Sequence, residues 1–147
     1  MKRILLSLVA PTLVVTAVPA FGDDQTACNN PGPEAIAACT RLIESDKLDE
    51  GQRGEALLNR GVAHVEAKAF AQALADIKAS VRHFDEAIRR TPNSAPLFHH
   101  RGEACQLLQR STLAIADYDE AFRLDPKDIF ARRAADKLRA SAASPRP

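Results

Sequence analysis

The most regular hydrophobic pattern in the chain lies between residues 70 and 90. Apolar side chains recur there at spacings of 3, 4, 3 and 4, which places them on one face of an α-helix: Leu74, Ile77, Val81, Phe84 and Ile88. Neither Gly nor Pro interrupts this segment. The pattern therefore predicts one extended helix over Phe70–Arg90, and a kinked or looped insert is the alternative.

Two further segments have the apolar and polar faces of amphipathic helices. Segment 35–43 reads Ala-Ile-Ala-Ala-Cys-Thr-Arg-Leu-Ile. Segment 128–143 places charged side chains on one side and apolar ones on the other, at Ile129, Ala131, Ala134, Ala135 and Leu138. Together with the extended helix, these segments favour an all-α fold.

The start of the chain, 1–22, has a different pattern. Two basic residues precede an apolar run over 4–18, and small residues follow around Ala20 and Gly22. This order is typical of a secretory signal peptide, cleaved after Ala20 or after Gly22. A transmembrane anchor is the alternative, but it needs about 20 apolar residues, and this run is shorter and contains Pro11. The sequence therefore predicts an exported protein, periplasmic or secreted, without stable membrane insertion after cleavage.

The composition agrees with helices and excludes one class of partner. Ala occurs 27 times and aromatic residues make up 5% of the chain, whereas β-sandwiches and barrels favour β-branched and aromatic residues. Without Lys2 and Arg3 of the signal segment, the remaining 18 Lys and Arg face 19 Asp and Glu, a net charge of −1. This balance argues against nucleic acid as a partner.

Self-comparison shows that one pattern occurs twice. An Arg-Gly-x-Ala motif begins at Arg60 and returns at Arg101. The segment Phe-Asp-Glu-Ala at 84–87 returns as Tyr-Asp-Glu-Ala at 118–121. The two copies are offset by 41 residues at the first motif and by 34 at the second. Internal periods of about 20–50 residues are the signature of repeat architectures. The first copy contains an insertion of one heptad, nearly two helical turns, which lengthens a helix without rotating its buried face.

These motifs resemble the tetratricopeptide repeat, a family of two-helix hairpins stacked into a solenoid. The family's small, aromatic and proline positions fall on Gly61, Ala73, Phe84, Ala87 and Pro92 in the first copy, and on Phe98, Gly102, Ala114, Tyr118, Ala121 and Pro126 in the second. An earlier half-copy at 35–43 resembles a second helix that lacks its first. The resemblance implies a short α-solenoid over 33–143: a half-repeat, two full repeats and a C-terminal capping helix. A disordered tail is expected at 144–147.

The repeat pattern predicts several local contacts. Gly61 and Gly102 are expected to let two helices approach closely, with the small residues Ala73 and Ala114 facing them. The repeat prolines cannot continue a helix, so each ends the helix before it. Just beyond these breaks lie two predicted N-caps, namely Ser94 and Asp128.

The cysteines indicate a covalent link near the start of the repeats. Cys28 and Cys39 are close in the sequence, and Asn, Pro and Gly between them favour a turn. Disulfides persist in oxidising compartments, so the sequence predicts a Cys28–Cys39 disulfide that ties a non-helical leader, 23–32, to the half-repeat. A metal site is the alternative, but the two thiols have no neighbouring His. Cys105 is predicted to be a buried apolar residue.

Catalytic and cofactor-binding signatures are missing from the sequence. It contains no Gly-x-Ser-x-Gly, Gly-x4-Gly-Lys, His-Glu-x2-His or Cys-x2-Cys motif, and we expect neither an enzyme nor a cofactor. One cluster, His99, His100 and Glu103, has metal-binding chemistry. Adjacent helical residues point about 100° apart, so the two imidazoles do not converge, whereas His99 and Glu103 can. A solvated groove face is the favoured interpretation, and no metal is expected.

The resemblance also implies a partner site. In this family the first helix of each hairpin lines a concave groove that receives a protein or peptide segment. Asn59 matches the Asn of members that clamp a terminal carboxylate, but Val62, Glu66 and Glu103 stand where that clamp has basic residues. We therefore expect an extended segment with some positive charge. The implied groove residues are Leu58, Asn59, Val62, Val65 and Glu66 from the first copy and His99, His100, Glu103, Gln106 and Leu107 from the second.

An Arg precedes each repeat glycine where the family more often has an apolar residue. In both copies an Asp follows that Arg at the same distance along the chain. This shared spacing predicts ion pairs between the two helices of each hairpin, Arg60–Asp76 and Arg101–Asp117. Unrelated surface charges are the alternative.

The sequence thus favours a small exported helical-repeat protein that is not an enzyme and binds another protein or peptide. Two alternatives stay open. The first is a self-associating unit whose open ends bury one another in a homodimer. The second is a small-ligand or metal carrier that uses His99 and Glu103.

Overall fold

The computed structural model describes residues 21–30 and 32–144. The predicted signal peptide up to residue 20 and the last part of the predicted tail, 145–147, lie outside these ranges. The described residues form seven α-helices and no strand: α1 (Phe21–Asn29), α2 (Ala35–Glu44), α3 (Glu50–Glu66), α4 (Phe70–Arg90), α5 (Ala95–Leu107), α6 (Ser111–Leu124) and α7 (Ile129–Ala143). Within this part of the chain, no helix combines the length and the apolar character needed to cross a membrane.

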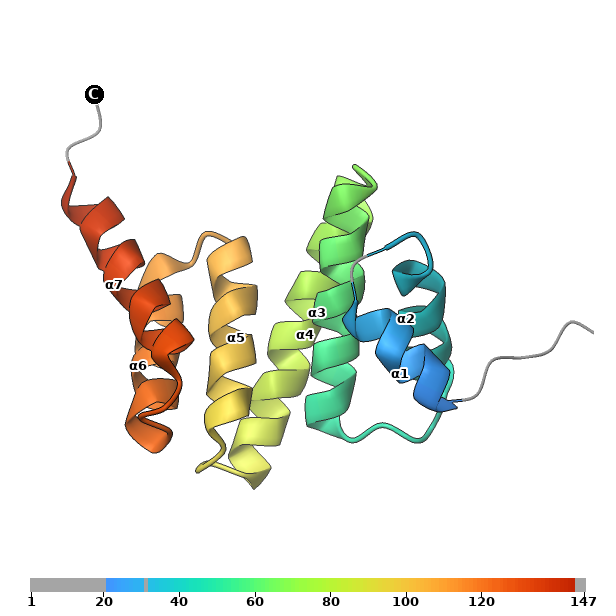
Figure 1. The fold of residues 1–147 in the computed structure, drawn as a ribbon, viewed down its shortest axis with the longest axis horizontal. Helices are drawn as coiled ribbons and strands as arrows, with labels where there is room; N and C mark the ends of the chain where they lie inside the picture. The colour runs from blue at the N-terminus through green and yellow to red at the C-terminus, as the bar shows by residue number, and fades with distance from the viewer. Residues whose placement is uncertain (1–20, 31, 145–147) are drawn as a thin grey trace, which may run out of the picture.

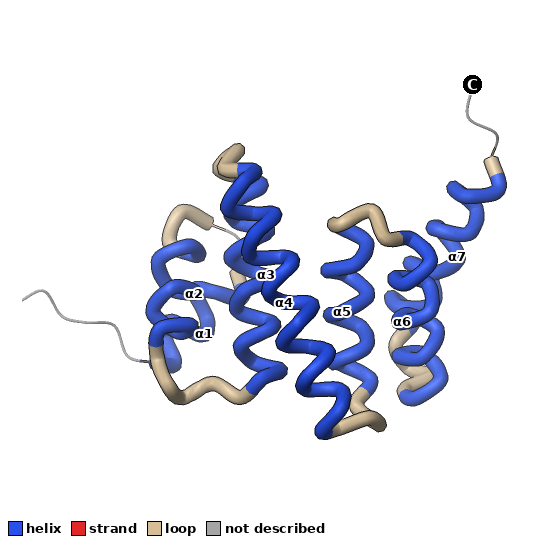
Figure 2. The backbone as a smooth tube through the Cα atoms, turned by 180° about the vertical axis from the view of Figure 1, so that it is seen from behind, coloured by secondary structure: helices blue, strands red, loops and turns tan. Residues whose placement is uncertain are grey.

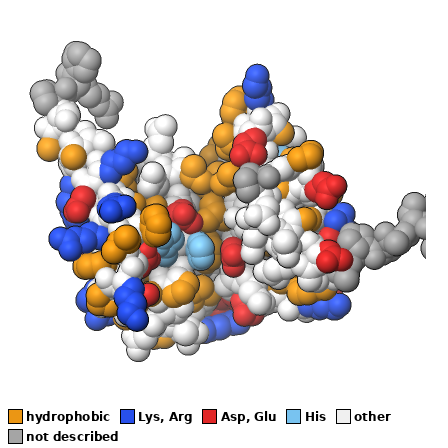
Figure 3. Space-filling view, in the orientation of Figure 1, with side chains coloured by type: hydrophobic (Ala, Val, Ile, Leu, Met, Phe, Trp, Pro, Cys, Tyr) orange, Lys and Arg blue, Asp and Glu red, His pale blue; other side chains and the backbone are white. Residues whose placement is uncertain are grey.

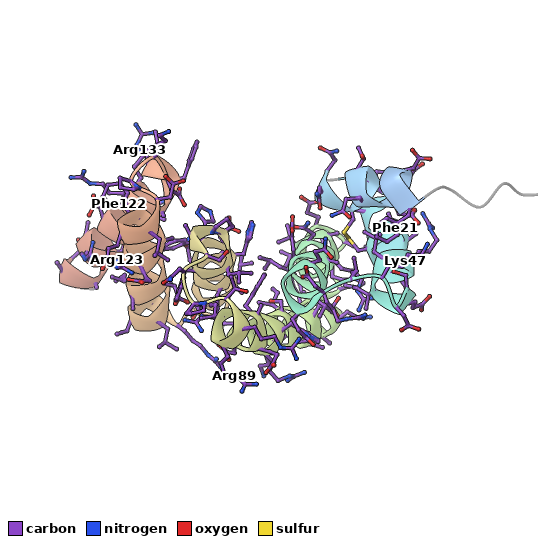
Figure 4. All side chains as sticks on the ribbon, turned by 90° about the horizontal axis from the view of Figure 1, so that it is seen from below. Phe21, Lys47, Arg89, Phe122, Arg123 and Arg133 are labelled. Carbon is purple, nitrogen blue, oxygen red and sulfur yellow. A yellow bond between two sulfur atoms is a disulfide. The ribbon has the colours of Figure 1, made fainter. Side chains whose placement is uncertain are left out.

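Each helix packs against the next one along the chain, so that the helices form a row from α1 to α7 (Figure 1). Helices α3 and α4 make one hairpin and α5 and α6 the next, and Figure 2 shows α4 between α3 and α5 on the reverse side. The row curves into a U, with α4 at its base and an arm on either side (Figure 4). The fold is therefore the predicted all-α solenoid of tetratricopeptide-like hairpins, with α2 as the half-repeat and α7 at the far end.

The extended helix predicted over Phe70–Arg90 is confirmed. Helix α4 has 21 residues, whereas its counterpart α6 has 14. A Cβ on Gly61 would lie 2.7 Å from Ile77 Cγ1, and a Cβ on Gly54, two turns earlier on α3, would lie 2.8 Å from the Phe84 ring. The insertion therefore adds a second glycine–apolar contact on the same face of α4. Leu74, at the start of the stripe, is 47% exposed.

In the second hairpin the glycine packs against an aromatic ring. A Cβ on Gly102 would lie 3.0 Å from two ring atoms of Tyr118. The closest facing residue is therefore Tyr118 and not Ala114, because the long side chain of Tyr118 reaches across to α5. Phe84 fills the space between the two hairpins: it is fully buried, and its ring stacks on His100 of α5 at a centroid distance of 6.1 Å.

Both predicted ion pairs are confirmed, and each is bidentate. In the first hairpin, Arg60 donates to the two carboxylate oxygens of Asp76 at 2.7 and 2.8 Å. In the second, Arg101 donates to Asp117 at 2.9 and 2.6 Å. The side chains of both aspartates are about nine-tenths buried, at 11% and 7% exposure.

The same arginines also reach back to the preceding helix. Arg60 donates from Nη1 to Thr40 Oγ1 of α2 at 3.0 Å, and Arg101 donates from Nη1 to Asp85 of α4 at 2.8 Å. Each guanidinium therefore joins three consecutive helices. A planar guanidinium with five donors suits this arrangement better than a lysine ammonium does.

The N-terminal end corrects one prediction and confirms another. The leader is helical over most of its length, because α1 extends from Phe21 to Asn29 and packs against α2. The half-repeat therefore has a short first helix instead of none. The Cys28–Cys39 disulfide is present, with Cα atoms 4.8 Å apart, and joins these two helices.

A third bidentate ion pair supports the disulfide. Arg41 of α2 donates to the carboxylate of Asp24 of α1, with distances of 2.9 Å from Nε and 2.5 Å from Nη2 to Oδ1. Asp24 is buried, at 6% exposure. A short helix with two acidic residues in its first turn, Asp23 and Asp24, is also favoured by the helix dipole.

The C-terminal end matches the predicted cap. Ala131 and Ala135 of α7 are fully buried against α6, whereas Ile129, predicted on the same face, is 47% exposed. Asp128 caps α7 by accepting a hydrogen bond from the Ala131 N–H at 3.0 Å. Ser94 occupies the N-cap position of α5 but makes no side-chain capping bond. Cys105 is buried at 2% exposure, as predicted.

Candidate functional site

A hollow of about 310 Å³ opens between α3 and α5 on the inner side of the U. Its lining residues are Leu58, Asn59, Val62, Glu103, Gln106, Leu107 and Tyr118. All of these except Tyr118 are among the groove residues implied by the repeat pattern. They converge because α3 and α5 are the first helices of successive hairpins and lie on the same side of α4.

Tyr118 is the lining residue that the groove prediction missed. It belongs to α6, the second helix of its hairpin, and reaches the hollow past Gly102, which has no side chain to block it. Its hydroxyl donates a hydrogen bond to Gln106 Oε1 at 2.9 Å. The sequence contained a signal for this position, since Tyr118 is one of the repeat-defining residues.

A second hollow of about 280 Å³ lies between the end of α1 and α3. It shares Asn59 and Val62 with the first hollow, so the two adjoin along α3. Glu66 lines this second hollow together with Asn29 and Asn30, two residues that the groove prediction did not include. Their contribution follows from the unpredicted helix α1, which brings its C-terminal end to the groove.

Asn59, the residue that matches the carboxylate-clamp asparagine, is already hydrogen-bonded within the chain. Its Nδ2 donates to Asn29 Oδ1 at 3.0 Å. This bond joins α3 to α1 and competes with any ligand for the same amide group. A clamp for a terminal carboxylate is therefore further disfavoured.

The remaining predicted groove residues lie to either side. His99 and His100 line a third hollow of about 330 Å³, between the start of α5 and the loop before α7. They connect it to the first hollow through Glu103, which contacts both imidazoles. Val65 is 41% exposed on α3 and lines none of these three hollows. Figure 3 views this face and shows histidine and acidic side chains at its centre.

His99 is the centre of an ionic cluster that joins α5 to α7. Its Nδ1 lies 2.6 Å from Asp128 Oδ2, and its Nε2 lies 3.6 Å from Glu103 Oε1. The interaction with Glu103 and the hydrogen bond with Asp128 outweigh burial and raise the pKa of His99 from 6.5 to about 9. His99 is therefore a cation at neutral pH.

The pKa of Glu103 is shifted in the opposite direction to that of His99. Burial by itself would raise its pKa, but the hydrogen bond with His100 and the ion pair with His99 outweigh burial and lower the pKa to about 2. Asp128 also has a lowered pKa: burial opposes the shift, and the hydrogen bonds from the Ala131 N–H and from His99 dominate. The His99 cation is thus held between two carboxylates that stay ionised at neutral pH, in the part of the groove nearest α7.

We expect the protein to lose about 1–2 kcal/mol of stability between pH 6.5 and 9 as His99 deprotonates. The folded state raises the pKa of His99, so its stabilising contribution is complete below pH 6.5 and is lost as the pH rises through about 9. Urea unfolding followed by circular dichroism across this range measures the effect. The variant His99→Gln should show a flatter profile, and an unchanged slope in that variant would contradict the assignment.

The metal-carrier alternative finds little support in this geometry. Both ring nitrogens of His99 face carboxylates as ion-pair partners. The rings of His99 and His100 meet edge to face, with centroids 5.6 Å apart, and one nitrogen of each ring faces the Glu103 carboxylate as an ion-pair partner. Among the described residues, no group of three or more His, Cys, Asp or Glu side chains is arranged to hold a metal ion.

Comparison with known proteins gives one informative similarity. No protein-family model matches the chain. The chain is 34% identical over 92 residues to the mitochondrial import receptor subunit TOM70 of Homo sapiens. The similar region covers 63% of this chain but only 14% of that subunit, so the chain spans a small part of the length of this relative.

Proposed function

We propose that this protein is a non-enzymatic, exported scaffold that binds an extended protein or peptide segment in its concave groove. The observation that carries the proposal is the pair of adjoining hollows along α3, which share Asn59 and Val62. They form a continuous recess on the inner face of the solenoid. A recess of this shape accepts a chain segment laid across α3 more readily than a compact small molecule.

The chemistry of the recess supports a segment with both apolar and polar groups. Val62 and Leu107 are 38% and 47% exposed and offer apolar contacts. The side chains of Asn59 and Gln106 offer amide groups that pair with a peptide backbone. Glu66 is exposed at one side, which favours a positive charge on the bound segment. The similarity to a subunit of an import receptor also agrees with a receiving surface.

Export is part of the proposal and rests on two features. The segment 1–22 has the order of a signal peptide. The Cys28–Cys39 disulfide joins α1 to α2, and such bonds persist in oxidising compartments. Mass spectrometry of the N-terminus of the protein recovered from its host tests this part, since cleavage after Ala20 or Gly22 supports it and an intact Met1 contradicts it.

A photo-crosslinking experiment in cells tests the groove. A photo-reactive amino acid replaces Val62, which lines both adjoining hollows, and the control position is Leu74, a half-exposed aliphatic residue on α4. We expect a discrete crosslinked partner from position 62 and none from position 74. Equal crosslinking from both positions, or none from position 62 under conditions where the protein is abundant, would reject the groove as the binding site.

A further inference from the structure

The first and last segments of the solenoid carry opposite net charges. The N-terminal end, residues 21–49, holds six acidic side chains against two basic ones, a net charge of −4. Helix α7 holds four basic side chains against one acidic one, a net charge of +3. The intervening residues, 50–128, hold 12 acidic and 11 basic side chains, a net charge of −1. The terminal segments of a chain that is almost neutral overall therefore carry net charges of opposite sign.

The two charged regions lie at opposite ends of the row of helices. Helices α1 and α2 form one end and α7 forms the other (Figure 1). Figure 3 shows Lys and Arg side chains gathered at the α7 end, and Figure 4 places Arg133 on the α6–α7 arm, away from the α1–α2 arm. Because each end belongs to a separate arm of the U, the two regions cannot neutralise each other within one molecule.

The charges at both ends are accessible. Arg133 and Lys137 are exposed, spaced by four on α7, and neither forms an ion pair with another residue in the part of the chain that the structure describes. Glu44 and Asp46 at the other end are likewise exposed and without an ion pair among the described residues. The α7 end also exposes apolar surface, since Phe130 is 70% and Ile129 is 47% exposed.

We propose that the basic face of α7 docks against the acidic α1–α2 end of a second copy of this chain. A second copy is the partner that the charges favour, because each molecule carries both an acidic end and a basic end that are complementary to each other. Exposed Phe130 and Ile129 supply apolar surface that the contact can bury. This burial is needed because ion pairs between solvent-exposed side chains contribute little binding free energy.

The arrangement is head to tail and not a symmetric dimer. A two-fold interface places the same patch of each copy against itself, which would set α7 against α7 and like charges together. A head-to-tail contact instead leaves one acidic and one basic end open after each addition, so association continues into short chains. The inner faces of α3 and α5 stay uncovered, and the contact is therefore independent of the proposed peptide groove.

Salt-dependent association tests the contact with the protein purified as its host processes it. Sedimentation velocity at about 20 mM NaCl, where screening is weak, should show a weight-average mass that rises with concentration beyond two protomers. At about 0.5 M NaCl, where charges are screened beyond a few ångströms, the protein should be monomeric. Association through apolar surface strengthens with salt or does not respond to it, so the direction of the salt effect separates the two causes.

Charge-reversal variants locate the contact. The variant Arg133→Glu/Lys137→Glu should be monomeric at low salt, and so should Glu44→Lys/Asp46→Lys. An equimolar mixture of the two should associate again, because the first keeps an intact acidic end and the second an intact basic end. The matched control is Lys78→Glu/Arg82→Glu, which makes the same charge change as the α7 variant with the same spacing at exposed positions on α4 and should behave as the unaltered protein.

Three outcomes would overturn the proposal. The first is an unaltered protein that stays monomeric at low salt up to its solubility limit. The second is a control variant that loses association as fully as the end variants, because this would show an effect of net charge without a defined contact. The third is a mixture of the two end variants that remains monomeric.

Discussion

Replacing Arg101 by Ala is expected to lower the free energy of unfolding by about 3 kcal/mol. The substitution removes the cation that pairs with Asp117, whose side chain is 7% exposed and would be left buried with an uncompensated charge. It also removes the hydrogen bond to Asp85 and the guanidinium that lies over the Phe98 ring, 5.5 Å from its centroid. Urea unfolding followed by circular dichroism measures the loss.

Arg123→Ala provides the matched control, because Arg123 also pairs with an acidic residue but has a side chain that is 63% exposed. Its substitution should leave the free energy of unfolding nearly unchanged, because an ion pair at the surface contributes little. A double-mutant cycle with Asp117→Ala should then give a coupling energy of about 1–3 kcal/mol between Arg101 and Asp117. A cost equal to that of the control, or a coupling energy near zero, would show that the pair does not hold the hairpin together.

Reduction of the disulfide is expected to open the N-terminal end while the second repeat stays folded. Closing the short loop between Cys28 and Cys39, with a sequence separation of 11, contributes on the order of 2–3 kcal/mol in the chain-entropy model. This end of the solenoid has a neighbour on one side only, and end units of repeat arrays have fewer stabilising interfaces. Loss of the disulfide should therefore remove a large share of the local stability.

Hydrogen exchange with and without reductant measures this effect segment by segment. We expect faster exchange in α1 and α2 after reduction and nearly unchanged protection in α6. The ion pair between Asp24 and Arg41 also joins α1 to α2, and Arg41→Ala in the reduced protein should increase exchange in α1 further. Equal loss of protection in α2 and α6 would mean that the solenoid unfolds as one unit. No change in either helix would mean that the disulfide does not contribute to the stability of the N-terminal end.

Most residues that line the hollow between α3 and α5 could be predicted from the repeat positions, but the ionic contacts beside it could not. Leu58, Val62 and Leu107 lie where the repeat pattern implies, because every tetratricopeptide-like hairpin presents the same face of its first helix. The contact between His99 and Asp128 joins two residues that are distant in the sequence, and Asp128 was predicted only as a helix cap. Its second role depends on the angle at which α7 packs, which no local pattern specifies.

The periodicity of apolar residues by itself determined which segments form helices with a buried apolar face. The residue spacing shared by the two repeats determined the contacts that occur in both hairpins. The length of α4 follows from its uninterrupted apolar stripe, and the pairing of Arg60 with Asp76 recurs in the next hairpin as Arg101 with Asp117.

Tertiary structure determined that the segment of α1 is helical. A helix this short is not stable alone in water, and α1 forms where Cys28 and Asp24 are buried against α2 by the disulfide and by Arg41. The same packing brings Asn29 to Asn59, so one side of the groove exists only because two distant segments stabilise each other.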